Sequence, residues 1–154
     1  MTDTRRGTNL VPLWRPDEAA AELQQALRSR PDDARLHNNL ASALLEEGRE
    51  EEALRELAEA VRLDPAYSLA RFNLGNGLIH AGRTQEGVGQ LVELLRGRDP
   101  ASAGLRLKAV AALAKLGPAA RSAEPALLEL ERRDPGSAEA VREALGRIRG
   151  TGRR

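Results

Sequence analysis

Residues 72–82, FNLGNGLIHAG, form the stretch whose composition most strongly suggests a chemical site. Gly75, Asn76 and Gly77 could begin a glycine-rich loop, in which backbone amides hold a phosphate group. Such a loop needs a strand before it and a helix directly after it. The preceding residues, DPAYSLAR, contain no β-rich run, and His80 stands where the pattern requires a third glycine. We therefore do not predict a nucleotide-binding loop.

Other residues with catalytic or metal-binding potential are dispersed along the chain. The two histidines, His37 and His80, have no second ligand at the spacing of a helical zinc motif. The chain has no cysteine, which excludes a disulfide, a thiolate metal site and a cysteine nucleophile. No serine lies in a nucleophile-elbow sequence. We expect no catalytic residue, no metal and no cofactor, and we predict that the protein is not an enzyme.

The composition favours helices and a location in the cytoplasm. Hydrophobic residues make up 41% of the 154 residues and aromatic residues only 2%, whereas 31% are charged. Alanine, leucine, glutamate and arginine are good helix formers. The net charge of +1 creates no field that would recruit nucleic acid or an anionic membrane. We see no signal peptide and no apolar run of the ~20 residues that a membrane span needs.

Proline and glycine recur with a period of 34 or 35 residues. The prolines are Pro31, Pro65, Pro100 and Pro135, and the glycines between them are Gly48, Gly82 and Gly117. Proline cannot continue a helix, and glycine readily caps one. The punctuation therefore predicts a repeated unit of helix, glycine turn, helix and proline turn.

The segments between these turns have helical periodicity. In residues 35–48 the apolar side chains Leu36, Leu40, Ala43 and Leu44 fall on one helix face. The following segment, 50–65, repeats this pattern, with its charged residues on the opposite face. The short connection at Gly48 predicts that the two helices form an antiparallel pair.

Two segments resemble tetratricopeptide repeats. In residues 37–65, HNNLASALLEEGREEEALRELAEAVRLDP, the matching positions are Leu40, Ala41, Leu44, Gly48, Ala53, Leu57, Ala60 and Pro65. Residues 72–100 resemble a second copy, with Leu74, Gly75, Leu78, Gly82 and Leu91 in register. The resemblance implies an all-α fold, an α-solenoid of stacked antiparallel helical hairpins, with about eight helices. Gly75 and Gly77 are then helical residues that allow close packing, and their flexibility predicts a locally soft second repeat.

We divide the chain into an amino-terminal arm, a repeat region, a divergent last unit and a basic tail. Residues 16–31 resemble only the second helix of a unit, and LVPLW, within the arm, is a candidate to cover its exposed end. The divisions are 1–15 for the arm, 16–31 for the half unit, 34–65 and 68–100 for the two tetratricopeptide-like units, 101–149 for the last unit with its capping helix, and 150–154 for the tail.

The last unit departs from the pattern because Pro125 lies where a continuous second helix would run. Proline is well tolerated at a helix start, so we expect a helix to begin near Glu124 or Pro125, after a turn through GPAARS. This arrangement resembles a HEAT-type repeat, and a degenerate tetratricopeptide repeat is the alternative. Residues 140–148 would form the first helix of a further unit.

The repeat geometry supplies the best candidate site. Stacked hairpins curve into a concave surface, and the resemblance implies that the first helix of each unit lines it. The candidate peptide-binding residues are Arg35, Asn38, Asn39, Ser42, Phe72, Asn73, Asn76 and His80, with Lys108 added if the third unit is tetratricopeptide-like. The 34-residue spacing of Asn39 and Asn73 predicts that these amides lie one above the other. The alternative is that these polar residues bind no ligand.

We therefore predict a protein-interaction scaffold or adaptor that binds an unidentified peptide or partner protein along its concave face. One alternative is a self-assembling structural module that pairs through its terminal helices as a homo-oligomer. Another is a non-catalytic accessory subunit of a larger enzyme.

Overall fold

The computed structural model describes residues 15–151, which form eight α-helices and three short 3-10 helices. The α-helices are α1 (Pro16–Ser29), α2 (Ala34–Glu46), α3 (Glu50–Leu63), α4 (Ser68–His80), α5 (Thr84–Arg96), α6 (Ala103–Leu116), α7 (Glu124–Arg133) and α8 (Ala138–Arg149). The 3-10 helices are η1 (Pro100–Ser102), η2 (Gly117–Ala123) and η3 (Pro135–Ser137). The amino-terminal arm before Arg15, including LVPLW, and the tail beyond Thr151 lie outside the described residues.

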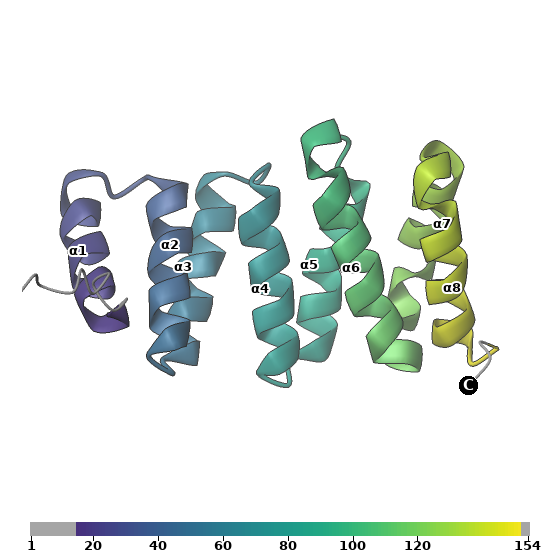
Figure 1. Ribbon diagram of the computed structural model, residues 1–154, viewed down its shortest axis with the longest axis horizontal. Coiled ribbons are helices and arrows are strands. Elements are labelled where there is room, and N and C mark those ends of the chain that lie inside the picture. The colour runs from purple at the N-terminus through teal and green to yellow at the C-terminus, as the bar shows by residue number, and fades with distance from the viewer. Residues whose placement is uncertain (1–14, 152–154) are drawn as a thin grey trace, which may run out of the picture.

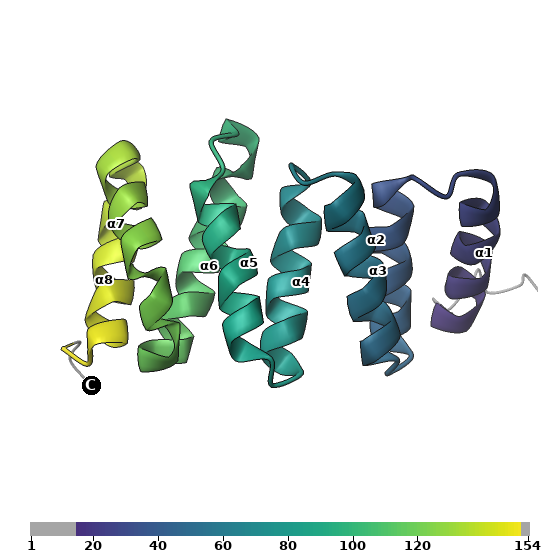
Figure 2. The ribbon, with the colours of Figure 1, turned by 180° about the vertical axis from the view of Figure 1, so that it is seen from behind.

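The helices stack in chain order along the long axis, with α1 at one end and α7 and α8 at the other (Figure 1). The helices α2, α4, α6 and α8 form one layer, and the helices α3, α5 and α7 form the layer behind it (Figure 2). The helix α2 packs on α3, and α4 packs on α5. The all-α solenoid of stacked helical pairs is confirmed.

The glycine turns close the first two hairpins in the same way. Gly48 has a φ of 76° and Gly82 a φ of 80°, in the left-handed region that glycine adopts without strain. One residue later, the N–H of Arg49 donates to the Leu44 carbonyl, and the N–H of Arg83 donates to the Leu78 carbonyl, both at 2.8 Å. These bonds occupy carbonyls that a helix end would otherwise leave unpaired.

Aspartate side chains fix the turns between units. The carboxylate of Asp64 accepts a hydrogen bond from the backbone N–H two residues later at 3.0 Å. Asp99 and Asp134 do the same at 3.0 and 3.1 Å. Each aspartate precedes a proline, which has no N–H to donate. The aspartate carboxylate therefore accepts from the backbone N–H of the residue after the proline. This geometry explains the repeated Asp-Pro pair.

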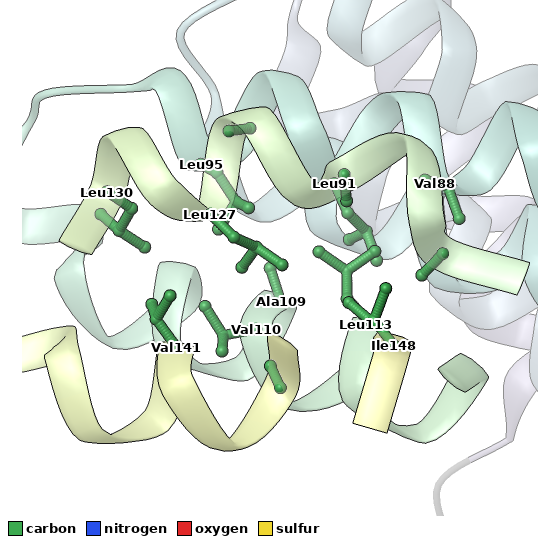
Figure 3. Packing of buried hydrophobic residues seen from close by; sticks show 14 of the residues in the cluster. Val88, Leu91, Leu95, Ala109, Val110, Leu113, Leu127, Leu130, Val141 and Ile148 are labelled. Carbon is green, nitrogen blue, oxygen red and sulfur yellow. The ribbon is translucent and has the colours of Figure 1, made fainter. Parts of the chain in front are cut away.

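The buried side chains form two separate clusters. One cluster lies within α1 to α4. The other, of which Figure 3 shows 14 residues, lies within α5 to α8 together with η2. The helix α4 contacts both clusters: Leu74 and Leu78 belong to the first, whereas Phe72 and Ile79 pack against the second. The second repeat therefore joins the two halves of the core.

Glycine allows the close approach of α4 and α5 at this junction. A Cβ atom built on Gly87 would lie 2.5 Å from the carbonyl oxygen of Gly75, and one built on Gly75 would lie 2.8 Å from the Leu91 side chain. Across the other side of α4, a Cβ on Gly77 would lie 2.8 Å from the Leu54 side chain. The helical, closely packed interpretation of Gly75 and Gly77 is confirmed.

The third unit differs from the first two in its connection. A seven-residue 3-10 segment, η2, separates α6 from α7, and α7 begins at Glu124 as the sequence predicts. Gly117 starts this segment with φ 56° and ψ −133°, a conformation that only glycine adopts readily. The segment packs against α5, α6 and α8, and α7 packs against α5 and α8. The longer connection thus fills space between the last helices.

Within residues 15–151, no helix has both the length and the apolar character that crossing a bilayer requires.

Candidate functional site

A groove lies between α2 and α4, with α3 as its floor. Its volume is about 480 Å³. The apolar part of its lining is Ala41, Leu45, Leu54, Leu57 and Gly77, and the polar part is Ser42, Glu46, Glu50, Asn73, Asn76 and His80. The size and the mixture of an apolar floor with a few polar groups are typical of a ligand site.

A second groove of about 480 Å³ lies one unit further along, between α4 and α6. Its lining is Phe72, Asn76, Ile79, His80, Lys108, Ala111, Ala112, Lys115 and Leu116. Asn76 and His80 line both grooves, so the two form one track across α2, α4 and α6.

The structure brings most of the predicted site residues to these grooves. Ser42, Asn73, Asn76 and His80 line the first groove, and Phe72, Asn76, His80 and Lys108 line the second. The other three lie elsewhere. Arg35 borders a depression at the turn between α1 and α2, whereas Asn38 and Asn39 line neither groove.

The side chain of Asn73 pairs with Asn38 and not with Asn39, the residue that the repeat period aligns with it. Asn73 donates its side-chain N–H to the amide oxygen of Asn38 at 3.0 Å, and the Asn38 side chain is buried with 3% exposure. Asn39, one residue later on α2, is exposed. A spacing of 34 residues aligns the backbone of Asn73 with that of Asn39. The side chain of Asn73, however, reaches Asn38, which lies 35 positions earlier.

The apolar floor and one apolar rim residue were missed as site residues. Leu54 and Leu57 belong to the core stripe of α3, and their groove-facing edges become apparent only when α2 and α4 are placed. Leu45 carried a signal in the sequence, because it directly follows Leu44 and so falls outside the buried stripe of α2. Leu45 is 41% exposed.

Asn76 is the polar residue best placed to contact a ligand. It lies on α4 between the two grooves and is partly exposed. Its amide has no hydrogen-bond partner among residues 15–151. A side-chain amide offers both a donor and an acceptor, which are the two groups that an extended peptide backbone requires.

The two ends of the track differ in charge. Glu46 and Glu50 lie at the α2 end of the first groove, and Lys108 and Lys115 lie on α6 in the second. The nearby Arg49 is held by ion pairs with Glu47 at 2.9 Å and Glu52 at 2.6 Å.

His37 lies away from the grooves and links three segments. Its Nδ1 is 2.6 Å from Glu56 of α3, and its Nε2 is 2.8 Å from the Pro31 carbonyl. Burial of the ring disfavours protonation, but the hydrogen bonds to Glu56 and Pro31 outweigh it and raise the pKa of His37 above 6.5. Its role is structural, because it joins the two helices of one unit to the preceding turn.

In the part of the chain that the structure describes, no group of three or more histidine, aspartate or glutamate side chains is arranged to hold a metal ion.

Comparison with known proteins identifies the repeats. A tetratricopeptide repeat family model matches residues 5–68 and 51–103, which together make up more than half of the chain. No HEAT-type family is matched to residues 101–149, so the HEAT resemblance of that part is not supported. No curated protein matches the chain.

Two solved structures have a similar fold. The crystal structure of MamA protein is 16% identical, with a TM-score of 0.57, and the match covers 87% of this chain and 64% of that chain. A crystal structure of MamA is 18% identical, also with a TM-score of 0.57, and the match covers 88% of this chain and 86% of that chain. At such low identity the likeness extends to the fold alone.

Proposed function

Because the chain belongs to the tetratricopeptide repeat family, we propose that it is an interaction scaffold that binds an extended peptide segment of a partner protein in its two grooves. Tetratricopeptide repeats imply protein–protein interaction, and proteins built from them are generally non-catalytic scaffolds. The bound segment lies along the track from α2 to α6, where the two grooves share Asn76 and His80.

The observation that carries this proposal is the position of Asn76 above an apolar floor. The amide is partly exposed between two grooves and has no partner within residues 15–151. Leu45 borders the same groove with 41% of its side chain exposed. An amide that pairs with a peptide backbone, beside an apolar surface that receives a side chain, is the arrangement used to bind extended peptides.

The test is affinity capture of partner proteins by three forms of the full chain. These are the wild type, the groove variant Leu45→Ser/Asn76→Ala and the control Leu128→Ser. Leu128, on α7, is similarly exposed at 38% and lies outside both grooves. We expect the control to retain a partner that the folded groove variant loses. Equal retention by both variants would show that the partner binds elsewhere.

A further inference from the structure

The chain contains only two lysines, and both lie in the same groove. All the other side-chain cations in the sequence are arginines. Lys108 and Lys115 are seven residues apart on α6, a spacing that places them on one helix face, and both line the second groove. Both side chains are exposed, and neither forms an ion pair or hydrogen bond with any residue in 15–151.

Among residues 15–151, no arginine side chain lines either groove. Lys108 and Lys115 are therefore the side-chain cations of the track that an incoming anion meets. An unengaged ammonium group beside an apolar groove attracts a carboxylate.

The opposite end of the track has the opposite sign. Glu46 and Glu50 line the first groove beside Leu45. The closest arginine in sequence, Arg49, is held by Glu47 and Glu52. Between the acidic and basic ends lie the neutral side chains of Asn73 and Asn76.

From this charge order we infer that the peptide bound by the grooves is bipolar, with side-chain carboxylates over Lys108 and Lys115 and a basic residue over Glu50. This inference rests on the proposed function and adds to it the composition of the bound segment. Electrostatic complementarity of this kind fixes the register of a ligand and disfavours partners with the reverse charge order.

The separation of the charges sets the length of the peptide. Packed helices lie ~10 Å apart, so the two steps from α2 to α6 span roughly 20 Å, which about six residues of extended chain cover. A peptide of about a dozen residues is therefore long enough to carry both charged ends and the neutral segment between them.

The experiment selects binders from a random 12-residue peptide library, displayed on phage, with three forms of the full chain as bait. These are the wild type, the groove variant Lys108→Glu/Lys115→Glu and the control Arg28→Glu/Arg132→Glu. The control makes the same change in net charge at two exposed arginines of α1 and α7, outside both grooves.

We expect the wild type and the control to enrich peptides with acidic residues at one end and basic residues at the other. The groove variant should bind these peptides at least about tenfold more weakly. If acidic residues are not enriched, or the groove variant binds as the wild type does, the bipolar inference is wrong while peptide binding stands. If no form selects any peptide, the proposed function itself is contradicted.

A second measurement observes the lysines directly. Reductive methylation with ¹³C-formaldehyde labels only Lys108, Lys115 and the terminal amine, and it keeps their charge. Addition of a selected peptide should shift both lysine methyl signals in the NMR spectrum. The peptide used should saturate the wild type and should no longer bind Asn76→Ala. If the lysine methyl signals stay unchanged when this peptide is bound, the inference is overturned.

Discussion

His37 and Arg71, 34 residues apart, make the same two contacts in successive units. Each joins the first helix of its unit to a residue 19 positions later on the second helix, and to a proline carbonyl six positions earlier. For His37 these partners are Glu56 at 2.6 Å and Pro31 at 2.8 Å. For Arg71 they are Gln90 and Pro65, both at 3.0 Å. Different side chains thus perform one structural task in the two repeats.

The third unit retains only part of this arrangement. Arg106, the next equivalent residue, donates to the Asp99 carbonyl at 2.8 Å and is 7% exposed. The position 35 residues after Gln90 is Pro125, whose side chain cannot accept a hydrogen bond. The Nε of Arg106 is buried without a partner in the described structure. The proline in the first turn of α7 therefore offers Arg106 no acceptor, so the described part of this unit lacks the side-chain hydrogen bond that joins the two helices of the earlier units.

Stability should depend on pH through His37. Because the folded protein raises the pKa of His37 above 6.5, protonation stabilises the fold. This contribution is complete below the unfolded pKa of about 6.5 and is lost as the pH rises through the higher folded pKa. We expect the free energy of unfolding in urea to fall as the pH rises above about 6.5. His37→Gln should remove this pH dependence, whereas His80→Gln should retain it.

Gly87 and Gly89 should respond oppositely to alanine. At Gly87 a new Cβ would meet the Gly75 carbonyl oxygen and the Ile79 side chain, so Gly87→Ala should destabilise the protein by about 1–3 kcal/mol. A Cβ built on Gly89 would meet no atom within 4 Å outside its own helix backbone, so Gly89→Ala should stabilise α5 by up to about 1 kcal/mol. Thermal and urea unfolding measure the change in stability of each variant. Equal effects would contradict the close contact between α4 and α5.

Asn73 should matter for stability and Asn39 should not. Asn73→Ala leaves the amide oxygen of the buried Asn38 without its donor, which should cost about 1–3 kcal/mol. Asn39 is exposed, so Asn39→Ala should change stability by less than about 0.5 kcal/mol. Urea unfolding of the two variants tests the pairing. If Asn39→Ala lowers the free energy of unfolding more than Asn73→Ala does, the hydrogen bond between Asn73 and Asn38 does not join α2 to α4.

Arg133 should stabilise the end of α5. Its guanidinium donates to the carbonyls of Leu95, of Arg96 at 2.9 Å and of Gly97 at 2.8 Å, where the helix leaves acceptors unpaired. Arg133→Ala should lower the free energy of unfolding by about 1–2 kcal/mol, because water partly replaces the lost charged hydrogen bonds. Arg132→Ala, at an exposed neighbour, should have an effect within about 0.5 kcal/mol.

The second repeat should exchange its amide hydrogens fastest among the helical hairpins. Gly75 and Gly77 in α4, with Gly87 and Gly89 in α5, lower the helix propensity of both helices. This hairpin also lies where the two hydrophobic clusters meet. Hydrogen exchange with mass spectrometry measures local opening. The prediction is wrong if α4 and α5 prove to be the best-protected helices of the chain.

The sequence predicted the helices well because their punctuation is local. Gly48 and Gly82 adopt the left-handed conformation at the turns, and the aspartates before the prolines bond to nearby amides. Even the start of α7 at Glu124 followed from the tolerance of proline in a first helical turn. Each of these features depends on residues within a few positions of one another.

The site was predicted less well because it depends on how the helices pack. The repeat period aligned Asn39 with Asn73, but in the packed structure Asn73 bonds to Asn38. The packing of α2 and α4 over α3 also makes Leu45, Leu54 and Leu57 part of the groove lining. A difference of one residue on a helix turns a side chain by ~100°, which is enough to move it from the core to a ligand site.

The close contact of Gly75 and Gly87 also limits how this sequence can drift over evolutionary time. A side chain at residue 75 would meet Leu91 and the Gly87 carbonyl oxygen, and one at residue 87 would meet Ile79 and the Gly75 carbonyl oxygen, so either would push α4 and α5 apart. Mutations at the two positions are therefore not independent, and an acceptable change at one depends on which residue occupies the other. Among homologous chains, residues 75 and 87 should covary, whereas the exposed Gly89 should drift freely.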